Sequence, residues 1–379
     1  MKKSISDSSK NSSLSSKAAS VCLAPGDSVN HIDHLAVIAY IMDVPVVTDE
    51  EYLAQVIKKY YPQVKPLYIP QHAQILEFLA HEYDVLFVSS ANYRKDLSPL
   101  LEVIFRKKMQ FWYCPHGNSD KPMKQFGQQN LSLIYGNQME DRLKNQEILP
   151  KLDAYVKTSN YRFPFYWKYQ DFYDKLAQEE VFSGFKKKQT TILYAPTWQD
   201  LESSSSLFDV GLPLVEQLPD SYNLIVKLHP WLEHHQPGYV NLIREKYQDR
   251  PNVVVLSLFP LVLPLLKRTD IYLGDFSSIG YDFLYFNRPM FFFDAEKRTD
   301  KEREASNFLH SCGIQIPESA YNNIYSFIKQ NLDQQEEIKE KRSKLYRYTF
   351  GEDRDFDEIR KELNALALKL RDEPPTCPG

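Results

Sequence analysis

The strongest constraint in this sequence is an alternation of short β-rich runs and helical stretches, which occurs twice along the chain. In the first half we predict strands over residues 21–25, 45–48, 64–70, 84–89, 110–114 and 153–158. Between them we predict helices over residues 33–42, 50–60, 71–81 and 97–107, from their apolar spacing of about 3.6 residues. This alternation is typical of a parallel sheet with helices on both faces.

The alternation restarts after a polar segment at residues 183–189. Further strands are predicted over 191–195, 224–228, 253–256, 271–274 and 290–293, and helices over 213–218, 239–246, 260–267, 277–286, 324–342 and 355–370. A length of 379 residues also exceeds what one core usually supports. We therefore predict an α/β chain of two Rossmann-like domains facing a cleft, with C-terminal helices. The predicted divisions are a disordered Ser-rich leader (1–19), an N-terminal domain (20–180), a linker (181–188), a C-terminal domain (189–370) and a flexible tail (371–379).

Composition excludes several classes of function. The formal net charge of -4 argues against nucleic acid as a partner, since that needs a basic footprint. The chain has only 12 glycines and no GxGxxG or P-loop motif. Its four cysteines have neither zinc-site nor disulfide spacing, and no carboxylate cluster has metal-ligand spacing, so we predict no metal, no cofactor and a reducing cytoplasm. The sequence contains no run of about 18 apolar residues, so we predict no membrane-spanning helix.

Ligands of parallel α/β sheets gather at the carboxyl ends of the strands, and two loops there carry unusual residues. His116 follows an apolar strand, with Gly117 allowing an unusual turn and Lys121 adding a cation. It is a candidate general base or phosphate contact, and the alternative is a loop histidine bonded to nearby backbone. Thr197 ends the sequence Tyr194-Ala195-Pro196-Thr197. It is a candidate phosphate donor, and the alternative is a simple strand terminator.

Two later loops add cations and hydroxyls. Lys227 and His229 alternate along one strand end and suggest an anion, the alternative being a buried salt bridge. Asp275, Ser277 and Ser278 lie between a strand and a helix, where hydroxyls and backbone amides can hold an anion. The alternative there is ordinary helix capping. His31, Asp33 and His34, at the start of the first helix, are second-tier candidates.

The ordered set of motifs resembles the CDP-glycerol glycerophosphotransferase family, whose members include the primases and polymerases of teichoic-acid synthesis. The set is His-Gly with a lysine five residues after the histidine, Tyr-Ala-Pro-Thr, Lys-Leu-His-Pro, and Asp-x-Ser-Ser with Asp282 and Arg288-Pro289 beyond. These elements span residues 111–294, and a late Gly351-Glu352-Asp353 also resembles the family's ending. The first motif departs from the family pattern at residues 118–120.

The resemblance implies a GT-B fold with an N-terminal acceptor domain and a C-terminal nucleotide-binding domain. It implies two essential histidines, His116 and His229, and a donor diphosphate held at Ser277 and Ser278. The implied activity is transfer of glycerol-phosphate, or a related polyol-phosphate, from a CDP-linked donor such as CDP-glycerol to a hydroxyl-bearing envelope acceptor, with release of CMP. We expect a cytoplasmic location at the inner face of the membrane, with peripheral contact. Two alternatives stay open: a GT-B glycosyltransferase that uses a nucleotide-sugar, and a non-catalytic binding protein.

Overall fold

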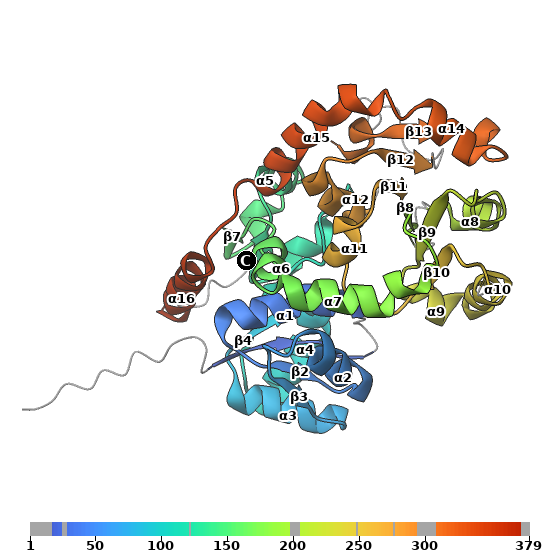
Figure 1. The fold of residues 1–379 in the computed structure, drawn as a ribbon. Coiled ribbons are helices and arrows are strands. Elements are labelled where there is room, and N and C mark those ends of the chain that lie inside the picture. The colour runs from blue at the N-terminus through green and yellow to red at the C-terminus, as the bar shows by residue number, and fades with distance from the viewer. Residues whose placement is uncertain are drawn as a thin grey trace, which may run out of the picture.

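Two parallel β-sheets, one in each half of the chain, form the framework of the molecule (Figure 1). The computed structural model describes residues 17–24, 29–120, 123–197, 205–247, 249–275, 277–293 and 308–372. The first sheet has seven strands and the second has six. Every strand pairing is parallel, as the alternating pattern of the sequence predicts.

The first sheet has the strand order β3-β2-β1-β4-β5-β6-β7, which is the order of a Rossmann-like sheet with one added strand. Its strands are β1 (Ala18–Val21), β2 (Val46–Thr48), β3 (Pro66–Tyr68), β4 (Val85–Val88), β5 (Gln110–Tyr113), β6 (Leu131–Ile134) and β7 (Ala154–Lys157). Its helices are α1 (Val29–Met42), α2 (Glu51–Tyr60), α3 (His72–Glu82), α4 (Tyr93–Phe105) and α5 (Asn137–Asn145). Helices α6 (Arg162–Lys168) and α7 (Gln170–Glu180) then lead to the second sheet.

The second sheet repeats this order as β10-β9-β8-β11-β12-β13. Its strands are β8 (Thr190–Ala195), β9 (Tyr222–Lys227), β10 (Val253–Leu256), β11 (Ile271–Gly274), β12 (Met290–Phe293) and β13 (Ile314–Ile316). Its helices are α8 (Leu207–Glu216), α9 (Trp231–His235), α10 (Pro237–Tyr247), α11 (Leu263–Lys267), α12 (Ser278–Phe283) and α14 (Ile324–Gln330). Central strands such as β4 and β12 are fully buried apolar runs, because helices cover both faces of a parallel sheet.

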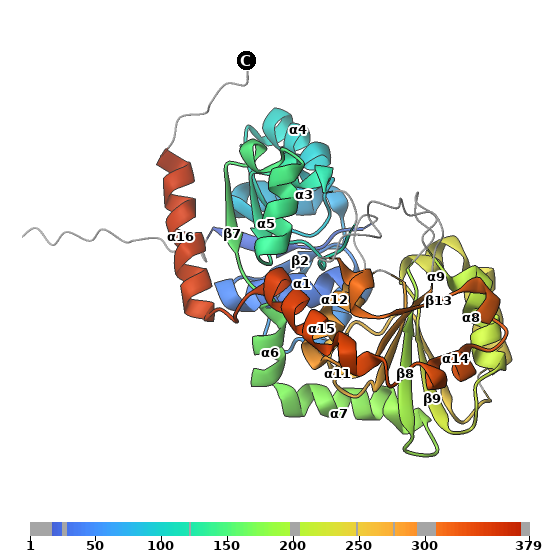
Figure 2. The ribbon, with the colours of Figure 1, turned by 90° about the horizontal axis from the view of Figure 1, so that it is seen from above.

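The chain ends in two longer helices, α15 (Gln335–Phe350) and α16 (Phe356–Asp372), which return to the first half (Figure 2). Helix α15 reaches α5, where Tyr348 donates to Asp141 (2.6 Å). Helix α16 contacts α1 and β7. The sequence placed residues up to 370 in the C-terminal domain, whereas the contacts of α16 lie with the first sheet. No helix within the described ranges is long and apolar enough to cross a membrane.

Several predicted elements differ from the observed ones. The first strand begins at Ala18, inside the predicted disordered leader, because Ala18 and Ala19 are buried and pair with β4. Strands β6 and β13 were not predicted from the sequence. The single helix predicted over 324–342 is instead α14 and α15, which pack in different places.

Both sheets turn the carboxyl ends of their strands toward one shared region. The strand order reverses between β1 and β4 in the first sheet, and between β8 and β11 in the second. At such switch points the loops on either side diverge and leave a crevice, which is where parallel α/β folds bind ligands. The loops that follow β5, β8, β9 and β11 carry the four motifs that the sequence singled out.

Candidate active site

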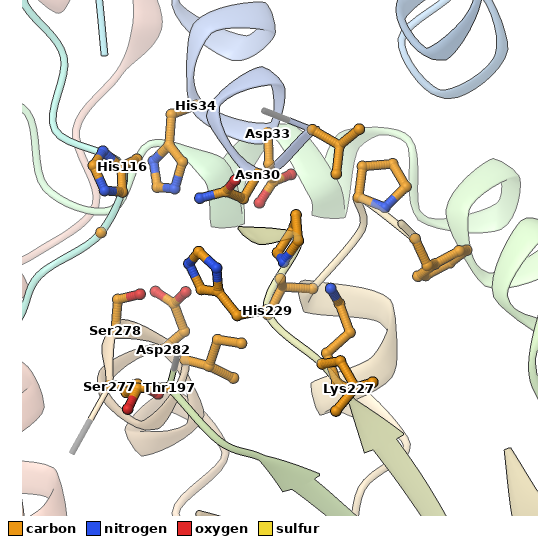
Figure 3. Close-up of a pocket in the computed structure, with 18 of the residues that line it drawn as sticks. Asn30, Asp33, His34, His116, Thr197, Lys227, His229, Ser277, Ser278 and Asp282 are labelled. Atoms are coloured by element: carbon orange, nitrogen blue, oxygen red, sulfur yellow. The ribbon is translucent and has the colours of Figure 1, made fainter. Parts of the chain in front are cut away.

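A cavity of about 170 Å³ lies between the two halves of the molecule (Figure 3). Eight of the site residues predicted from sequence line it. Two come from the first half, His116 and Gly117. Six come from the second half: Thr197, Lys227, His229, Ser277, Ser278 and Asp282. The tertiary structure therefore gathers residues that are up to 166 positions apart into one polar pocket.

Two of the predicted site residues that the structure describes do not line this cavity. Asp275 is buried and accepts hydrogen bonds from the backbone N–H groups of Thr197 (2.8 Å) and Ser206 (3.2 Å), so it anchors two loops. Burial raises the pKa of Asp275 to about 6, against the effect of these bonds. Arg288 lies at the opposite edge of the sheet, where it donates to the carbonyl of Thr269 (2.6 Å). Lys121 lies outside the described residues.

The proton on His116 is assigned by its contact with the backbone. Its Nδ1 lies 3.4 Å from the carbonyl oxygen of Ser89, at the end of β4. A carbonyl can only accept, so Nδ1 carries the proton and Nε2 is the proton-accepting nitrogen. The backbone contact that the sequence analysis weighed as an alternative to catalysis is thus present, and it orients the imidazole.

Gly117 allows the His116 loop to approach the second half. Its φ of +124° is one that side-chain-bearing residues rarely adopt. A Cβ placed on Gly117 would lie 2.4 Å from the Cβ of Ser278. Any larger residue would therefore push the two motif loops apart.

Two further histidines from α1 surround His116. The ring of His31 lies 4.4 Å from that of His116, centroid to centroid. The Tyr135 hydroxyl donates to the carbonyl of Pro115 (2.7 Å), so it accepts from Nδ1 of His34 (3.1 Å). Burial, together with the charge of Arg162 and the neighbouring histidines, holds the pKa of His34 well below its ordinary value. His34 is therefore a neutral histidine that lines the cavity.

His229 has the opposite proton assignment to His116. Its Nδ1 accepts the backbone N–H of Trp231 (3.2 Å), at the start of α9. In a neutral imidazole this leaves the proton on Nε2, which makes Nε2 the donating nitrogen. Figure 3 shows His229 between the His116–His34 side of the cavity and Ser278. One cavity thus holds a proton-accepting and a proton-donating histidine, one from each half.

Lys227 is a buried cation at the end of β9, only 6% exposed, and it lines the cavity. It makes no ion pair or hydrogen bond with any residue that the structure describes, so the salt bridge weighed as an alternative is absent there. Burial lowers the pKa of Lys227 to about 8, and the charge of Asp33 opposes this shift. A lysine is rarely buried without a partner, so this ammonium is suited to hold an anion.

The loop that carries Ser277 and Ser278 offers hydroxyl groups rather than a strong helix dipole. Helix α12 has only six residues, so its dipole is small compared with the long helix expected from the sequence. Ser277 occupies the N-cap position without a side-chain capping bond, and its hydroxyl lies 3.1 Å from that of Tyr272. Ordinary capping thus does not occupy this side chain.

A buried ion network ties the two halves together beside the cavity, and the sequence analysis missed its centre. Arg162, at the start of α6, donates to Asp33 of α1 (2.8 Å) and to both oxygens of Asp282 of α12 (2.6 and 2.5 Å). Tyr61 donates to the other oxygen of Asp33 (2.6 Å), and Asn160 donates to Oδ1 of Asp282 (2.8 Å), which also accepts from Arg162. The sequence signal that could have revealed this network is Arg162 itself, which stands at the start of an aromatic-rich stretch. An arginine buried among aromatic side chains needs charged partners.

Within the described residues, no group of three or more histidine, cysteine, aspartate or glutamate side chains could hold a metal ion. The polar side chains of the cavity include cations, imidazoles and hydroxyls, and its two carboxylates, Asp33 and Asp282, are paired with Arg162. This donor set is suited to phosphate oxygens.

Comparison with known families adds the decisive observation. Residues 168–354 match the model of the family described as CDP-Glycerol:Poly(glycerophosphate) glycerophosphotransferase. This part of the chain, just under half of its length, belongs to that family. The match contains three of the four motif loops and extends to the Gly351-Glu352-Asp353 ending, whereas the His116 loop precedes it.

One curated relative of this chain is the teichoic acid glycerol-phosphate primase of Bacillus subtilis (strain 168). The two are 32% identical over 132 residues, which is 32% of this chain and 31% of the primase. The chain thus matches less than a third of that relative's length.

Solved structures share the fold across nearly the whole of this chain. The wall teichoic acid polymerase TagF has a TM-score of 0.64 at 14% identity, covering 93% of this chain and 88% of that chain. The S. aureus MnaA–UDP co-structure has a TM-score of 0.61 at 13% identity, covering 96% and 100%. The predicted GT-B-type arrangement of two Rossmann-like sheets is therefore confirmed.

Proposed function

We propose that this chain transfers glycerol-phosphate, or a related polyol-phosphate, from a CDP-linked donor to a hydroxyl of an envelope polymer, and releases CMP. The observation that carries the proposal is the pairing of His116 and His229 in one cavity, with opposite proton assignments. Lys227 supplies a buried cation beside them. Family membership supports the same class of activity.

The reaction begins with attack by an acceptor hydroxyl on the β-phosphorus of the donor. Nε2 of His116 takes the hydroxyl proton as the new O–P bond forms. The bond between the β-phosphorus and the bridging oxygen breaks, and its electron pair leaves with CMP. His229 donates a hydrogen bond or the proton to the departing phosphate, and Lys227 balances its charge.

The two halves of the chain take different substrates in this proposal. The N-terminal domain, which supplies His116 and α1, holds the acceptor. The C-terminal domain holds the donor, with Lys227 and His229 on its diphosphate and Ser277 and Ser278 as further donors. Arg162 joins Asp33 to Asp282 across this boundary and holds the two sides of the cavity in register.

A donor panel tests the proposal. Thermal shift is measured with CDP-glycerol, CDP-ribitol, UDP-sugars and CMP, and CMP release is then followed with each donor that binds. We expect stabilisation by CMP and by a CDP-linked polyol, because both present the same phosphate to the cavity. Turnover only with a UDP-sugar would establish the glycosyltransferase alternative. Binding of CMP without turnover on any acceptor would establish the non-catalytic alternative.

Removing both serine hydroxyls should weaken donor binding. In a Ser277→Ala, Ser278→Ala variant, each lost hydrogen bond to a charged phosphate costs about 1.5–3 kcal/mol. The expected result is at least a tenfold higher Kd for CDP-glycerol, measured by calorimetric titration. Ser98→Ala with Ser183→Ala is the matched control, since these serines bond to Glu102 and to the backbone of Glu179, outside the cavity. Unchanged affinity with an intact circular dichroism spectrum would exclude this placement of the diphosphate.

A further inference from the structure

A second cavity, of about 500 Å³, opens at the opposite edge of the second sheet. It is lined near the starts of β8, β9, β11 and β12, whereas the active-site cavity lies at the carboxyl ends of β8, β9 and β11. Asn223 and Lys227 belong to the same strand, one in each cavity. They lie four positions apart along an extended strand, a distance of about 13 Å.

The charge of this second cavity is strongly one-sided. Its cationic lining residues are Lys186, Lys187, Lys188, Lys267, Arg268 and Arg288. Asp270 is its one carboxylate, and that side chain accepts the backbone N–H of Thr191 (2.8 Å). Lys267 pairs with Asp174, which lies outside the lining (2.5 Å), and the other five cations form no ion pair with any residue that the structure describes. In a chain with a net charge of -4, this is a local excess of positive charge. We call this lining the cationic groove.

The cationic groove combines three exposed lysines with two arginines whose side chains are fixed by contacts within the protein. Lys186, Lys187 and Lys188 are exposed and form no ion pair with any residue that the structure describes. Arg268 stacks on the ring of Phe182 at 3.6 Å, which limits the entropy that it loses on binding. Arg288 is fixed by bonds to backbone carbonyls.

One buried acceptor in the groove has no partner. Asn223 is 2% exposed, and its Nδ2 donates to the carbonyl of Lys187 (2.9 Å). Its Oδ1 is buried and lacks a hydrogen bond within the described part of the chain. Leaving such an atom unsatisfied costs about 1–3 kcal/mol, so a hydroxyl donor from a ligand would be favourable there.

We propose that the cationic groove binds a phosphodiester chain of polyol units, as a second site remote from the reaction. Such a chain has repeated negative charges for the cations and hydroxyls for Asn223. This inference rests on the proposed function, because that reaction would make or extend such a chain. The groove would hold units that have already passed the active site, so its effect grows with acceptor length.

Other polyanionic partners fit the cationic groove less well. The lining has two aromatic rings: Phe182 is buried beneath Arg268, and Phe185 packs against Phe182 edge to face (6.1 Å between centroids). Both rings are thus engaged within the protein, whereas a nucleic-acid base needs an open ring face on which to stack. A membrane-docking surface combines cations with exposed apolar side chains. None of the exposed large apolar side chains in the described ranges lines this groove.

Direct binding tests the inference without using the transfer reaction. The probe is a fluorescent ten-unit glycerol-phosphate oligomer, measured by fluorescence polarisation. A Lys186→Gln, Lys187→Gln, Lys188→Gln variant should bind it at least tenfold more weakly, while CMP release with a single-unit acceptor stays within twofold. The matched control is Lys108→Gln, Lys329→Gln, Lys361→Gln, three exposed lysines outside both cavities that should leave binding unchanged.

A second probe tests the role of Asn223. An oligomer of 1,3-propanediol phosphate has the same charges and lacks the free hydroxyl, so we expect it to bind at least threefold more weakly. Equal binding of the glycerol-phosphate oligomer to wild type and the triple-lysine variant would overturn the inference. Binding of anionic vesicles or heparin, but not of the oligomer, would overturn it as well. Absence of CMP release with every acceptor would instead contradict the proposed function, while the polarisation result would still decide the groove.

Discussion

Replacing His116 with alanine should reduce turnover by about 10²- to 10⁴-fold, while CDP-glycerol binding stays within about threefold of wild type. The reason is that, in the proposed mechanism, His116 acts on the acceptor hydroxyl in the transition state and does not hold the donor. Its ring is oriented by the backbone carbonyl of Ser89, which belongs to the first half. CMP release with a supplied acceptor and calorimetric titration of the donor measure the two quantities separately.

His229→Ala should instead reduce both turnover and donor affinity. In the proposed mechanism its donating Nε2 faces the diphosphate in the ground state and in the transition state, so it would contribute to binding as well as rate. His81→Ala is the matched control, because His81 is an exposed histidine of α3 bonded to the carbonyl of Glu77. Loss of donor binding in His116→Ala with retention in His229→Ala would reverse the two roles. Normal turnover in both variants would refute the mechanism.

Lys227→Met should make the ligand-free protein more stable and the donor bind more weakly. Burial lowers the pKa of Lys227 from 10.5 to about 8, so keeping the ammonium charged at pH 7 costs up to about 3 kcal/mol. Methionine keeps the unbranched stem without the charge. We expect a higher free energy of unfolding, together with a donor Kd about 10- to 150-fold larger, from the loss of one charged hydrogen bond.

The pH dependence of that difference gives a second measurement. Between pH 8 and 10.5 the unfolded state keeps the Lys227 proton and the folded state does not. The free energy of unfolding of the wild type therefore rises with pH relative to that of the variant. The stability advantage of Lys227→Met should thus be largest below pH 8 and vanish near pH 10.5. Lys329→Met, at an exposed site, should show no such trend. A destabilised Lys227→Met protein with unchanged donor affinity would contradict a role in anion binding.

The architecture and most of the site could be predicted from local sequence. Parallel strands are continuous apolar runs bounded by polar loops, so strands such as β4 and β12 are visible without tertiary information. The loops after such strands converge by the rule of parallel sheets, which is why eight of the motif residues line one cavity. Sequence spacing alone was enough to place His116 and His229 in different halves.

Two residues that lie close to the motifs in sequence were predicted to line the site but do not, because their side chains point elsewhere. Asp275 precedes Ser277 by two residues, yet it is buried as an anchor for Thr197 and Ser206. Arg288 follows the serine motif closely, yet it reaches the opposite edge of the sheet. Motif spacing records position along the chain and does not record the direction of a side chain.

The contacts between the two halves were decided only by the tertiary structure. Arg162 is bonded to Asp33 and Asp282, which lie more than a hundred residues away on either side, and local pattern cannot reveal such a pairing. The proton assignments of His116 and His229 likewise depend on which backbone group each Nδ1 meets. By itself the sequence determined two parallel sheets and the chemistry available at their loops, because apolar runs and turns are local. The tertiary structure decided which charges are paired and which, like Lys227, have no ion-pair partner among the described residues, because pairing depends on groups that only folding brings together.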